Sequence, residues 1–251
     1  MKLLFAFLMM TGLVYASGVD KETYFKGTDH MLEVYTIEGK EPGPIVLIVG
    51  GIHGDEVSTI EAADEYTKAK IEKGTLIVVP RANRPAIDKN VRLVNKDMNR
   101  VFFDQGAEDL YEYKIAAKIK ELVEKADLVL NLHEGKGFYS RTKNGMGQSV
   151  VADSDKILGL KMTAITAIKV MNKNIKQKKY YFKFNNQNTA SAKTKHPEQK
   201  GSLTYYSVYA AGKPAFGIEV SSDIKDSEYR VKLAMEAVDA FLKSVGIEHG
   251  F

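Results

Sequence analysis

Residues 45–56 read IVLIVGGIHGDE, and this stretch decides the fold class. Its first five residues are apolar and mostly β-branched, which is typical of a strand buried on both faces. Gly50 and Gly51 follow at once and predict a tight turn. From 56 to 73 apolar residues recur at helical spacing, and one face is formed by Val57, Ile60, Ala63 and Tyr66. A buried strand that turns sharply into an amphipathic helix is typical of an α/β sheet.

The same alternation continues outward along the chain. Further buried strands are predicted at 75–79, 128–132 and 215–220, an edge strand at 31–37, and helices at 107–126, 157–170 and 228–245. This order predicts an α/β fold with a mixed, largely parallel twisted sheet flanked by helices. The 251 residues are 44% hydrophobic, enough for one compact domain with a sizeable core. The net charge of +4 is too small to indicate nucleic-acid binding without a clustered basic face, so we expect none.

The N-terminus has the layout of a secretory signal. Lys2 precedes an apolar run over 3–14, and Ala16 is a small residue at the expected cleavage point. The alternative is a buried helix or strand at the start of the fold. We predict a signal peptide at 1–16, a single domain at 17–251 and a periplasmic location. The run is too short to span a bilayer and has no later counterpart, so we expect no membrane span in the mature protein. We also expect a monomer. The absence of cysteine excludes disulfides and anchoring through a lipidated cysteine.

Two strand ends carry candidate metal ligands. His53 and Glu56 lie three residues apart on the turn from strand into helix, and His133 lies at the tip of the strand at 128–132. In open α/β sheets the carboxyl ends of the strands form the ligand-binding edge, so these residues can converge. Each histidine alone would more often be a structural residue. Two imidazoles and one carboxylate together suit zinc and leave a fourth position open for water, as in a catalytic site. Other divalent ions could compete for the same ligands.

Glu219 lies inside the apolar strand at 215–220, where a carboxylate is costly unless it has a partner or a task. Beside a metal-activated water it would serve as general base and then protonate the leaving amine. The alternative is a charge at an exposed strand end. Asp55 and Glu134 flank the candidate ligands and could orient them, although plain structural carboxylates are an equal alternative.

The segment 81–100 is rich in arginine. A guanidinium binds a carboxylate through two parallel hydrogen bonds, and a buried one can polarise a carbonyl group. For Arg81 and Arg84 we expect ion pairs at the surface. His30, His196 and His249 are interpreted as surface residues. The segment 172–201 is rich in Lys, Asn, Gln and Thr; it is either a solvated excursion with a short hairpin or an insertion over the active site that contacts an anionic, sugar-containing substrate.

Four motifs occur in the order seen in zinc carboxypeptidases and in the related succinylglutamate desuccinylase and aspartoacylase group: GIHGDE at 51–56, DMNR at 97–100, NLH at 131–133 and GIE at 217–219. The chain resembles that superfamily over most of its length. The resemblance implies one zinc ion and a catalytic role for Glu219 as acid and base. It also implies that His53, Glu56 and His133 bind the zinc, that Arg92 polarises the carbonyl, and that Asn99 and Arg100 hold the substrate's terminal carboxylate.

A narrower resemblance is carried by NLHEGKGFY at 131–139, SLTYY at 202–206 and KPAFGIE at 213–219. These stretches are similar to the murein D,L-carboxypeptidases that set the shape of helical Gram-negative bacteria. The implied reaction releases meso-diaminopimelate from D-glutamate in the peptidoglycan tripeptide stem, with Tyr205 and Tyr206 among the substrate-binding residues. Some of those enzymes carry glutamine in place of His53, and histidine should favour firm zinc binding.

Three other functions remain open. The first is an amidohydrolase of N-acyl amino acids, as in the desuccinylase group, although those substrates are usually cytosolic. The second is a murein amidase that cuts another bond of the same stem. The third is a non-catalytic cell-wall binding protein with a degenerate peptidase cleft, against which the complete set of ligands and base argues. Activity that is lost on chelation and restored by zinc would distinguish an enzyme from a binding protein.

Overall fold

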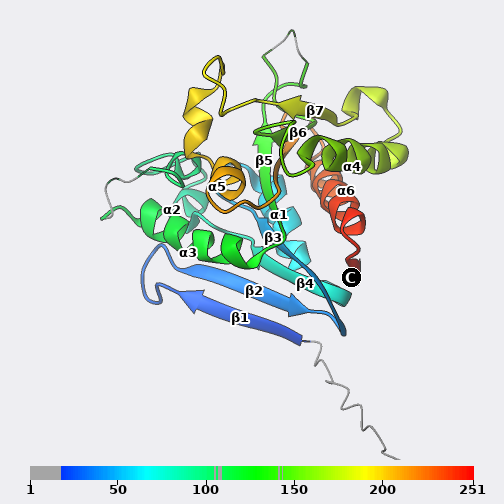
Figure 1. The fold of residues 1–251 in the computed structure, drawn as a ribbon. Helices are drawn as coiled ribbons and strands as arrows, with labels where there is room; N and C mark the ends of the chain where they lie inside the picture. Colours follow the sequence, from blue (N-terminus) through cyan, green and yellow to red (C-terminus); the bar gives the residue numbers. More distant parts are fainter. Residues whose placement is uncertain (1–17, 105, 107–108, 141, 143) are drawn as a thin grey trace, which may run out of the picture.

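The computed structural model describes residues 18–104, 106, 109–140, 142 and 144–251, so the predicted signal peptide at 1–16 lies outside the described residues. Within the described residues the strands form one nine-stranded mixed sheet (Figure 1). The strand order is β1-β2-β4-β3-β5-β8-β6-β7, and β9 pairs with β4. The strands are β1 Gly18–Tyr24, β2 Leu32–Glu38, β3 Glu41–Val49, β4 Lys70–Val79, β5 Leu128–Gly135, β6 Ser149–Ala152, β7 Lys183–Asn186, β8 Ala215–Ser221 and β9 Glu248–Gly250.

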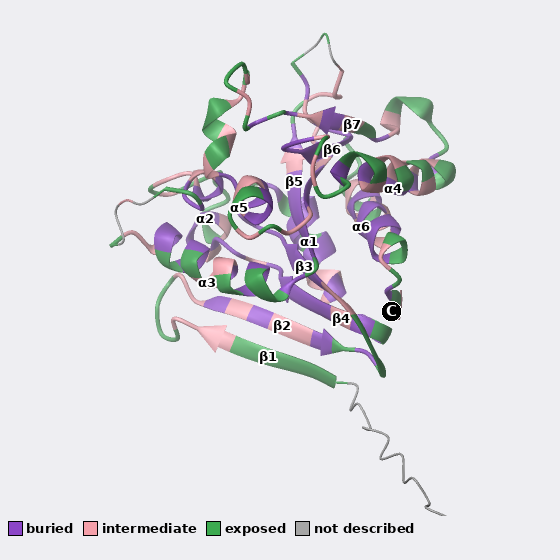
Figure 2. Ribbon diagram, viewed as in Figure 1, coloured by how far each residue is buried: buried purple, intermediate pink, exposed green. Residues whose placement is uncertain are grey.

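The centre of the sheet is parallel. The pairs β4–β3, β3–β5 and β5–β8 are parallel, whereas β1–β2, β2–β4 and β6–β8 are antiparallel. The predicted α/β fold with a mixed sheet is confirmed. The central strands are buried and β1 is largely exposed (Figure 2), which is the pattern expected where helices cover both faces of a parallel core.

Helices lie on both faces of the sheet. On one face α1, α4 and α6 pack together, and on the other α3 and α5 cover β3, β5 and β8 (Figure 1). The helices are α1 Val57–Tyr66, α2 Arg84–Asp88, α3 Tyr111–Lys125, α4 Leu160–Asn174, α5 Leu203–Tyr209 and α6 Ser227–Ser244, with 3₁₀ turns η1 Met98–Arg100, η2 Lys178–Tyr180 and η3 Pro197–Gly201. Among the described residues, no helix combines the length and the apolar character needed to cross a membrane.

Three expectations about local structure are wrong. The helix predicted at 56–73 ends at Tyr66, because Lys70 and Ile71 pair with β9 as the start of β4. The strand at 31–37 is not an edge strand, because β1 pairs with it. The segment 172–201 forms no hairpin; it contributes β7, which pairs parallel with β6, a strand that the sequence analysis missed. For β4 and β7 a strand distant in sequence decides the outcome, whereas β1 and β2 are neighbours in the chain.

Candidate metal centre and active-site pocket

The candidate metal ligands lie where two parallel strands end side by side. β3 and β5 pair in register up to Val49 and Asn131, so the turn after β3 and the end of β5 reach the same edge of the sheet. The turn is tight: Gly51 has a φ of +70°, and a Cβ added to Gly54 would lie 2.1 Å from the carbonyl carbon of Ala86. Gly54 therefore has no room for a side chain, and this close packing fixes how the chain enters α1.

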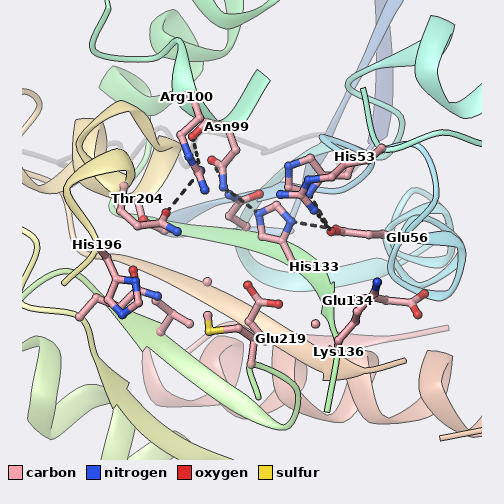
Figure 3. Close-up of a pocket in the computed structure, with 18 of the residues that line it drawn as sticks. His53, Glu56, Asn99, Arg100, His133, Glu134, Lys136, His196, Thr204 and Glu219 are labelled. Carbon is pink, nitrogen blue, oxygen red and sulfur yellow. Dashed lines mark hydrogen bonds and ion pairs between the residues drawn. The ribbon is translucent and has the colours of Figure 1, made fainter. Parts of the chain in front are cut away.

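His53, Glu56 and His133 form a compact cluster of ligand atoms. One nitrogen or oxygen atom of each lies within 4.8 Å of the others, and all three residues are buried. The Glu56 carboxylate lies between the rings, with Oε1 2.7 Å from Nδ1 of His53 and Oε2 2.8 Å from Nδ1 of His133 (Figure 3). Two imidazole nitrogens and a carboxylate oxygen that face one point fit a metal ion, and three protein ligands are the number typical of a catalytic site.

Asp97 fixes the orientation of the His53 ring. Its Oδ1 lies 3.1 Å from Nε2 of His53 and also accepts a hydrogen bond from the backbone N–H of Asn99 at 2.9 Å. A ring nitrogen that donates to a carboxylate leaves the other nitrogen free as a metal ligand. Asp97 belongs to the DMNR motif but had no predicted role; its position two residues before Asn99 in that motif was the only signal.

The charges within the cluster shift the pKa values of its members. Burial alone would lower the pKa of His53, but the charge of Glu56 and hydrogen bonds to Asp97 and Glu56 raise that pKa to about 9. Burial alone would raise the pKa of Glu56, but the charges of His133 and His53 lower it to about 2. Without a metal ion, Glu56 is therefore ionised and paired with protonated His53 at neutral pH.

Glu219 faces the cluster from the neighbouring strand. The register between β5 and β8 pairs Glu219 with His133, so the two side chains share a face, and Figure 3 shows the Glu219 carboxylate directed toward the His133 ring. Burial raises the pKa of Glu219; the charge of Glu56 adds to this, and nearby cationic groups only partly oppose it. A Cβ added to Gly135 would lie 2.8 Å from Oε2 of Glu219. The missing side chain at Gly135 therefore makes room for this carboxylate.

One pocket of about 590 Å³ contains the cluster, Glu219 and part of the arginine-rich segment. Gln187, His196, Glu198 and Gln199 also line it, so the segment 172–201 forms one wall, as the second of the two interpretations expected. His196 is a surface residue, as predicted, with a side chain that is 44% exposed, and it also lines this wall because it directly precedes η3 (Figure 3).

Arg92, Asn99 and Arg100 all line the pocket. Arg92 is half exposed and lies 3.4 Å from Oε1 of Glu56. Asn99 is buried, and its Nδ2 lies 3.4 Å from Nε2 of His133. Arg100 donates to the carbonyl oxygen of Asn99 at 2.8 Å and lies 3.5 Å from Oε1 of Gln199. The structure thus places all three predicted residues beside the cluster.

Tyr205 and Tyr206 do not line the pocket, in contrast to the prediction that they bind substrate there. Within α5 it is Thr204 that reaches the pocket. Tyr205 packs against Phe103, and Tyr206 lies 3.4 Å from a carboxylate oxygen of Glu124. Successive residues of a helix point about 100° apart, so side chains that follow Thr204 turn away from the pocket.

The remaining charged candidates have structural contacts. Arg81 pairs with Asp64, and Arg84 pairs with Asp88 one turn along α2, as expected for ion pairs at the surface. His249 is not a plain surface residue: its ring is largely buried, and Nε2 lies 2.9 Å from Oδ1 of Asp239.

Comparison with known proteins agrees with this geometry. Residues 13–250 match the model of the peptidase M99 family, described as the catalytic part of a carboxypeptidase controlling helical cell shape. The apo structure of the cell shape determinant protein Csd4 from Helicobacter pylori is similar, with a TM-score of 0.79 and 27% identity, over 88% of this chain and 56% of that chain. The mDAP-bound form of Csd4, a D,L-carboxypeptidase, has a TM-score of 0.77 and 28% identity, over 83% of this chain and 52% of that chain.

A curated relative is an N-alpha-acetyl-L-2,4-diaminobutyric acid deacetylase of Halomonas elongata, 32% identical over 106 residues, which are 40% of this chain and 31% of that protein. The chain thus spans little more than half of the similar solved chains and about a third of this relative. The family match and the shared fold nevertheless cover almost all described residues. The chain belongs to the peptidase M99 family, whose model is described as the catalytic part of a carboxypeptidase controlling helical cell shape.

Proposed function

We propose that the protein is a zinc-dependent D,L-carboxypeptidase that releases the terminal meso-diaminopimelate from D-glutamate in the peptidoglycan tripeptide stem. The observation that carries the proposal is the convergence, in one pocket, of the His53–Glu56–His133 cluster, a buried carboxylate and the Arg100 guanidinium. A metal site, a general base and a carboxylate-binding cation are the three parts needed to cut next to a free carboxyl group. The similarity to Csd4 in its mDAP-bound form supports this substrate class.

Zinc held by the cluster would supply Lewis-acid activation of water and of the scissile carbonyl group. Glu219 takes a proton from that water and returns it to the nitrogen of the leaving amino acid. Its raised pKa suits both steps, because a base with a pKa nearer neutrality holds and releases a proton more readily around pH 7. Asp97 holds Nε2 of His53, so the ring keeps Nδ1 on the side of Glu56, where it would be available to a metal ion.

Arg92 and Arg100 have different roles in this proposal. Arg92 contacts Glu56 and Asp97 at 3.4 and 3.3 Å and is half exposed, so it is free to swing toward the carbonyl oxygen and stabilise its developing negative charge. Arg100 and Asn99 anchor the carboxylate of the last residue, which restricts cleavage to a terminal bond. In this proposal, Arg100 is responsible for the choice of substrate end and Arg92 for rate.

We also propose that the protein acts as a monomer in the periplasm, where peptidoglycan lies. The support is the apolar run after Lys2, which precedes the described residues. Cell fractionation of a C-terminally tagged chain, with mass analysis of the mature N-terminus, tests the location, and sedimentation of the purified protein tests the oligomeric state.

The deciding experiment incubates the zinc-loaded mature protein with muramyl tripeptide and measures product masses. We expect loss of a single diaminopimelate, abolished by a chelator, restored by zinc and absent in Glu219→Gln. An unchanged tripeptide from protein shown to carry zinc would overturn the substrate assignment.

An amidohydrolase of N-acyl amino acids is the second candidate, favoured by the deacetylase relative. N-acetyl-diaminobutyrate and succinylglutamate belong in the same assay for that reason. Release of acetate or succinate without release of diaminopimelate would favour this second candidate.

A further inference from the structure

A second pocket, of about 700 Å³, adjoins the pocket that holds the metal cluster. One of its walls is the end of α4 with the segment that follows it through η2, and the other is the loop after β8 with the first half of α6. Asp223 lines this second pocket, and the residue before it, Ser222, lines the first. Neighbouring Cα atoms are about 3.8 Å apart, so the two pockets meet at this loop. We call the second one the tyrosine pocket, after Tyr180 and Tyr229, which both line it.

The two tyrosine rings are held in place by the fold. Their centroids lie 5.7 Å apart and their planes meet at 58°, so the rings form a corner. The Tyr180 ring also stacks on Phe138 at 5.9 Å, and its backbone carbonyl oxygen accepts a hydrogen bond from Nε2 of Gln148 at 2.7 Å. The backbone N–H of Tyr229 donates to Oδ1 of Asp226, the N-cap of α6, at 3.0 Å. Rings fixed in this way lose little conformational entropy when a ligand packs against them.

The polar groups around the rings suit a neutral ligand with many hydrogen-bonding groups. Asn174 and Gln177 line the tyrosine pocket, and among the described residues neither side-chain amide has a hydrogen-bond partner. Four lysines line it too, but so do the carboxylates of Asp223, Asp226 and Glu236, which would repel a polyanion such as a phosphate chain. An acetylated sugar fits this set, because its C–H faces pack on aromatic rings while its hydroxyl and amide groups bond to amides and carboxylates.

The tyrosine pocket lies on the side of the metal cluster to which the uncleaved part of the substrate extends. In the proposed function the leaving carboxylate lies at Asn99, whose Oδ1 accepts a hydrogen bond from Nδ2 of Asn131 at 3.5 Å. Asn131 lies two residues before His133 on β5, and Gly135 lies two residues after it, so the metal cluster lies between these ends of the first pocket. The part of the substrate before the cleaved bond therefore extends past Gly135, whose carbonyl oxygen accepts a hydrogen bond from the backbone N–H of Ser222 at 3.0 Å.

The length of the peptide stem matches the distance between the two pockets. Before the cleaved bond the stem consists of D-glutamate, L-alanine and the lactyl group of the sugar. Three such units span about 10 Å when extended, and somewhat more here because D-glutamate is linked through its side chain. From Glu219 to Asp223 the chain covers at most about 14 Å. The sugar therefore reaches the tyrosine pocket while the cleaved bond lies at the metal cluster.

We propose that the tyrosine pocket binds the acetylated sugar that carries the peptide stem. Tyr180 and Tyr229 pack against the sugar ring, and Asn174 and Gln177 form hydrogen bonds with its hydroxyl and acetamido groups. The inference rests on the proposed function and deepens it, because it makes a stem still attached to its sugar a better substrate than the free peptide. It also gives the first part of the segment 172–201 a function separate from that of the part that lines the first pocket.

The test compares muramyl tripeptide with the same tripeptide without its sugar. The zinc-loaded protein should cleave muramyl tripeptide with a kcat/KM at least about tenfold higher. Tyr229→Ala should lower kcat/KM for muramyl tripeptide by about tenfold, mainly through KM, and change that for the free tripeptide by less than about twofold. Tyr229→Phe keeps the ring and should retain the preference. Gln177→Ala, at an exposed position, should lower kcat/KM for muramyl tripeptide alone by about threefold to tenfold.

Two control variants show whether an effect belongs to the tyrosine pocket. Lys178→Ala changes an exposed residue of η2 that does not line the pocket, and Tyr35→Ala removes a half-buried tyrosine ring of β2 that lines neither pocket. Both should leave the preference for muramyl tripeptide unchanged while circular dichroism shows an intact fold. Equal kcat/KM for the two substrates in the parent protein, or an equal loss on both in Tyr229→Ala and Gln177→Ala, would overturn the sugar site.

Calorimetry separates this inference from the proposed function, because it needs no turnover. N-acetylmuramyl-L-alanyl-D-glutamate should bind the zinc-loaded protein at least about tenfold more tightly than L-alanyl-D-glutamate does, and Tyr229→Ala should remove the difference. If that difference is seen while the tripeptide is not cleaved, the sugar site stands and the carboxypeptidase assignment fails. If the tripeptide is cleaved and the two dipeptides bind equally, the carboxypeptidase assignment stands and the sugar site fails.

Discussion

Glu134 caps helix α1: one of its carboxylate oxygens accepts hydrogen bonds from the backbone N–H of Ser58, at 2.7 Å, and from the Ser58 hydroxyl. Glu56 occupies the N-cap position of α1, but its side chain is turned to the metal cluster and does not cap the helix. Glu134 supplies that cap from β5 and points away from the cluster (Figure 3). Arg230 of α6 lies 3.2 Å from its other oxygen. Glu134 follows His133 directly, so this contact joins the two segments that carry all three ligands.

Glu134→Gln should weaken metal binding without removing a ligand. The amide keeps the size of the side chain but loses the charge that holds the helix N-terminus and Arg230. We expect metal affinity to fall by about 10-fold to 100-fold and the free energy of unfolding to fall by about 1–3 kcal/mol. Competition with a chromogenic chelator and chemical denaturation measure the two effects. The control is Glu65→Gln in the same helix, where the carboxylate only pairs with exposed Lys68; equal effects in both variants would contradict this role.

Glu219→Gln should abolish turnover and keep the metal. Its raised pKa sets the pH dependence: a base must be ionised, so kcat/KM should fall as the pH drops through a value above the ordinary 4.5. The raised pKa of Glu219 also affects the stability of the metal-free protein, which it lowers at the pH at which the base is ionised. A carboxyl group whose folded pKa is raised destabilises the fold as the pH rises above 4.5, so the metal-free variant should unfold at a higher temperature than the parent at pH 7. Near-normal turnover would disprove the assigned role; Glu124→Gln is the matched control.

Metal affinity should rise with pH up to about 9. His53 must lose its proton to bind a metal, and its pKa of about 9 means that protons compete throughout the neutral range. In the metal-free protein the protonated ring contributes stability that is fully present below pH 6.5 and is lost as the pH rises through about 9. Linkage gives about 3 kcal/mol at most. Chelator competition and thermal unfolding between pH 6 and 10 test both signs, and an affinity that does not change with pH would contradict them.

Gly135→Ala should slow catalysis more than it weakens metal binding. The new methyl group would lie 2.8 Å from Oε2 of Glu219 and 2.7 Å from Cβ of Met146, so the carboxylate has to move. We expect kcat to fall by about 100-fold, as displacement of a catalytic group by about 1 Å does, with stability reduced by about 1–3 kcal/mol. The control is Gly250→Ala, where an added Cβ meets nothing within 4 Å. Unchanged kcat in Gly135→Ala would show that Glu219 needs no such space.

Arg100→Lys should affect substrate binding first. Lysine keeps the charge but loses the paired hydrogen bonds to a carboxylate, so KM should rise by about tenfold or more while the metal content stays the same. Arg84→Lys, which changes an exposed arginine of α2 paired with Asp88, is the control. A fall in kcat at constant KM would instead assign Arg100 to the chemical step.

The sequence by itself determined the parallel centre of the sheet and the order of the site motifs. Residues 45–49 are apolar and residues 128–132 are apolar except for Asn131, so both stretches favour buried strands, and parallel strands bring the residues that follow them to one edge of the sheet. Apolar spacing indicates buried strands locally, and together with the motifs at their ends it predicted that His53, Glu56, His133 and Glu219 converge, as they do in the pocket.

The tertiary structure decided what depends on partners distant in the chain. β7 carries no continuous apolar pattern and exists through backbone pairing with β6, whose paired residues lie 34 positions earlier in the chain. The phase of α5 turned Tyr205 and Tyr206 away from the pocket and brought Thr204 to it. The same holds for the contact between Glu134 and Ser58, which lie 76 residues apart in the chain. Hydrogen-bond partners and pocket walls follow from where strands lie next to one another, and that arrangement is fixed only when the whole sheet assembles.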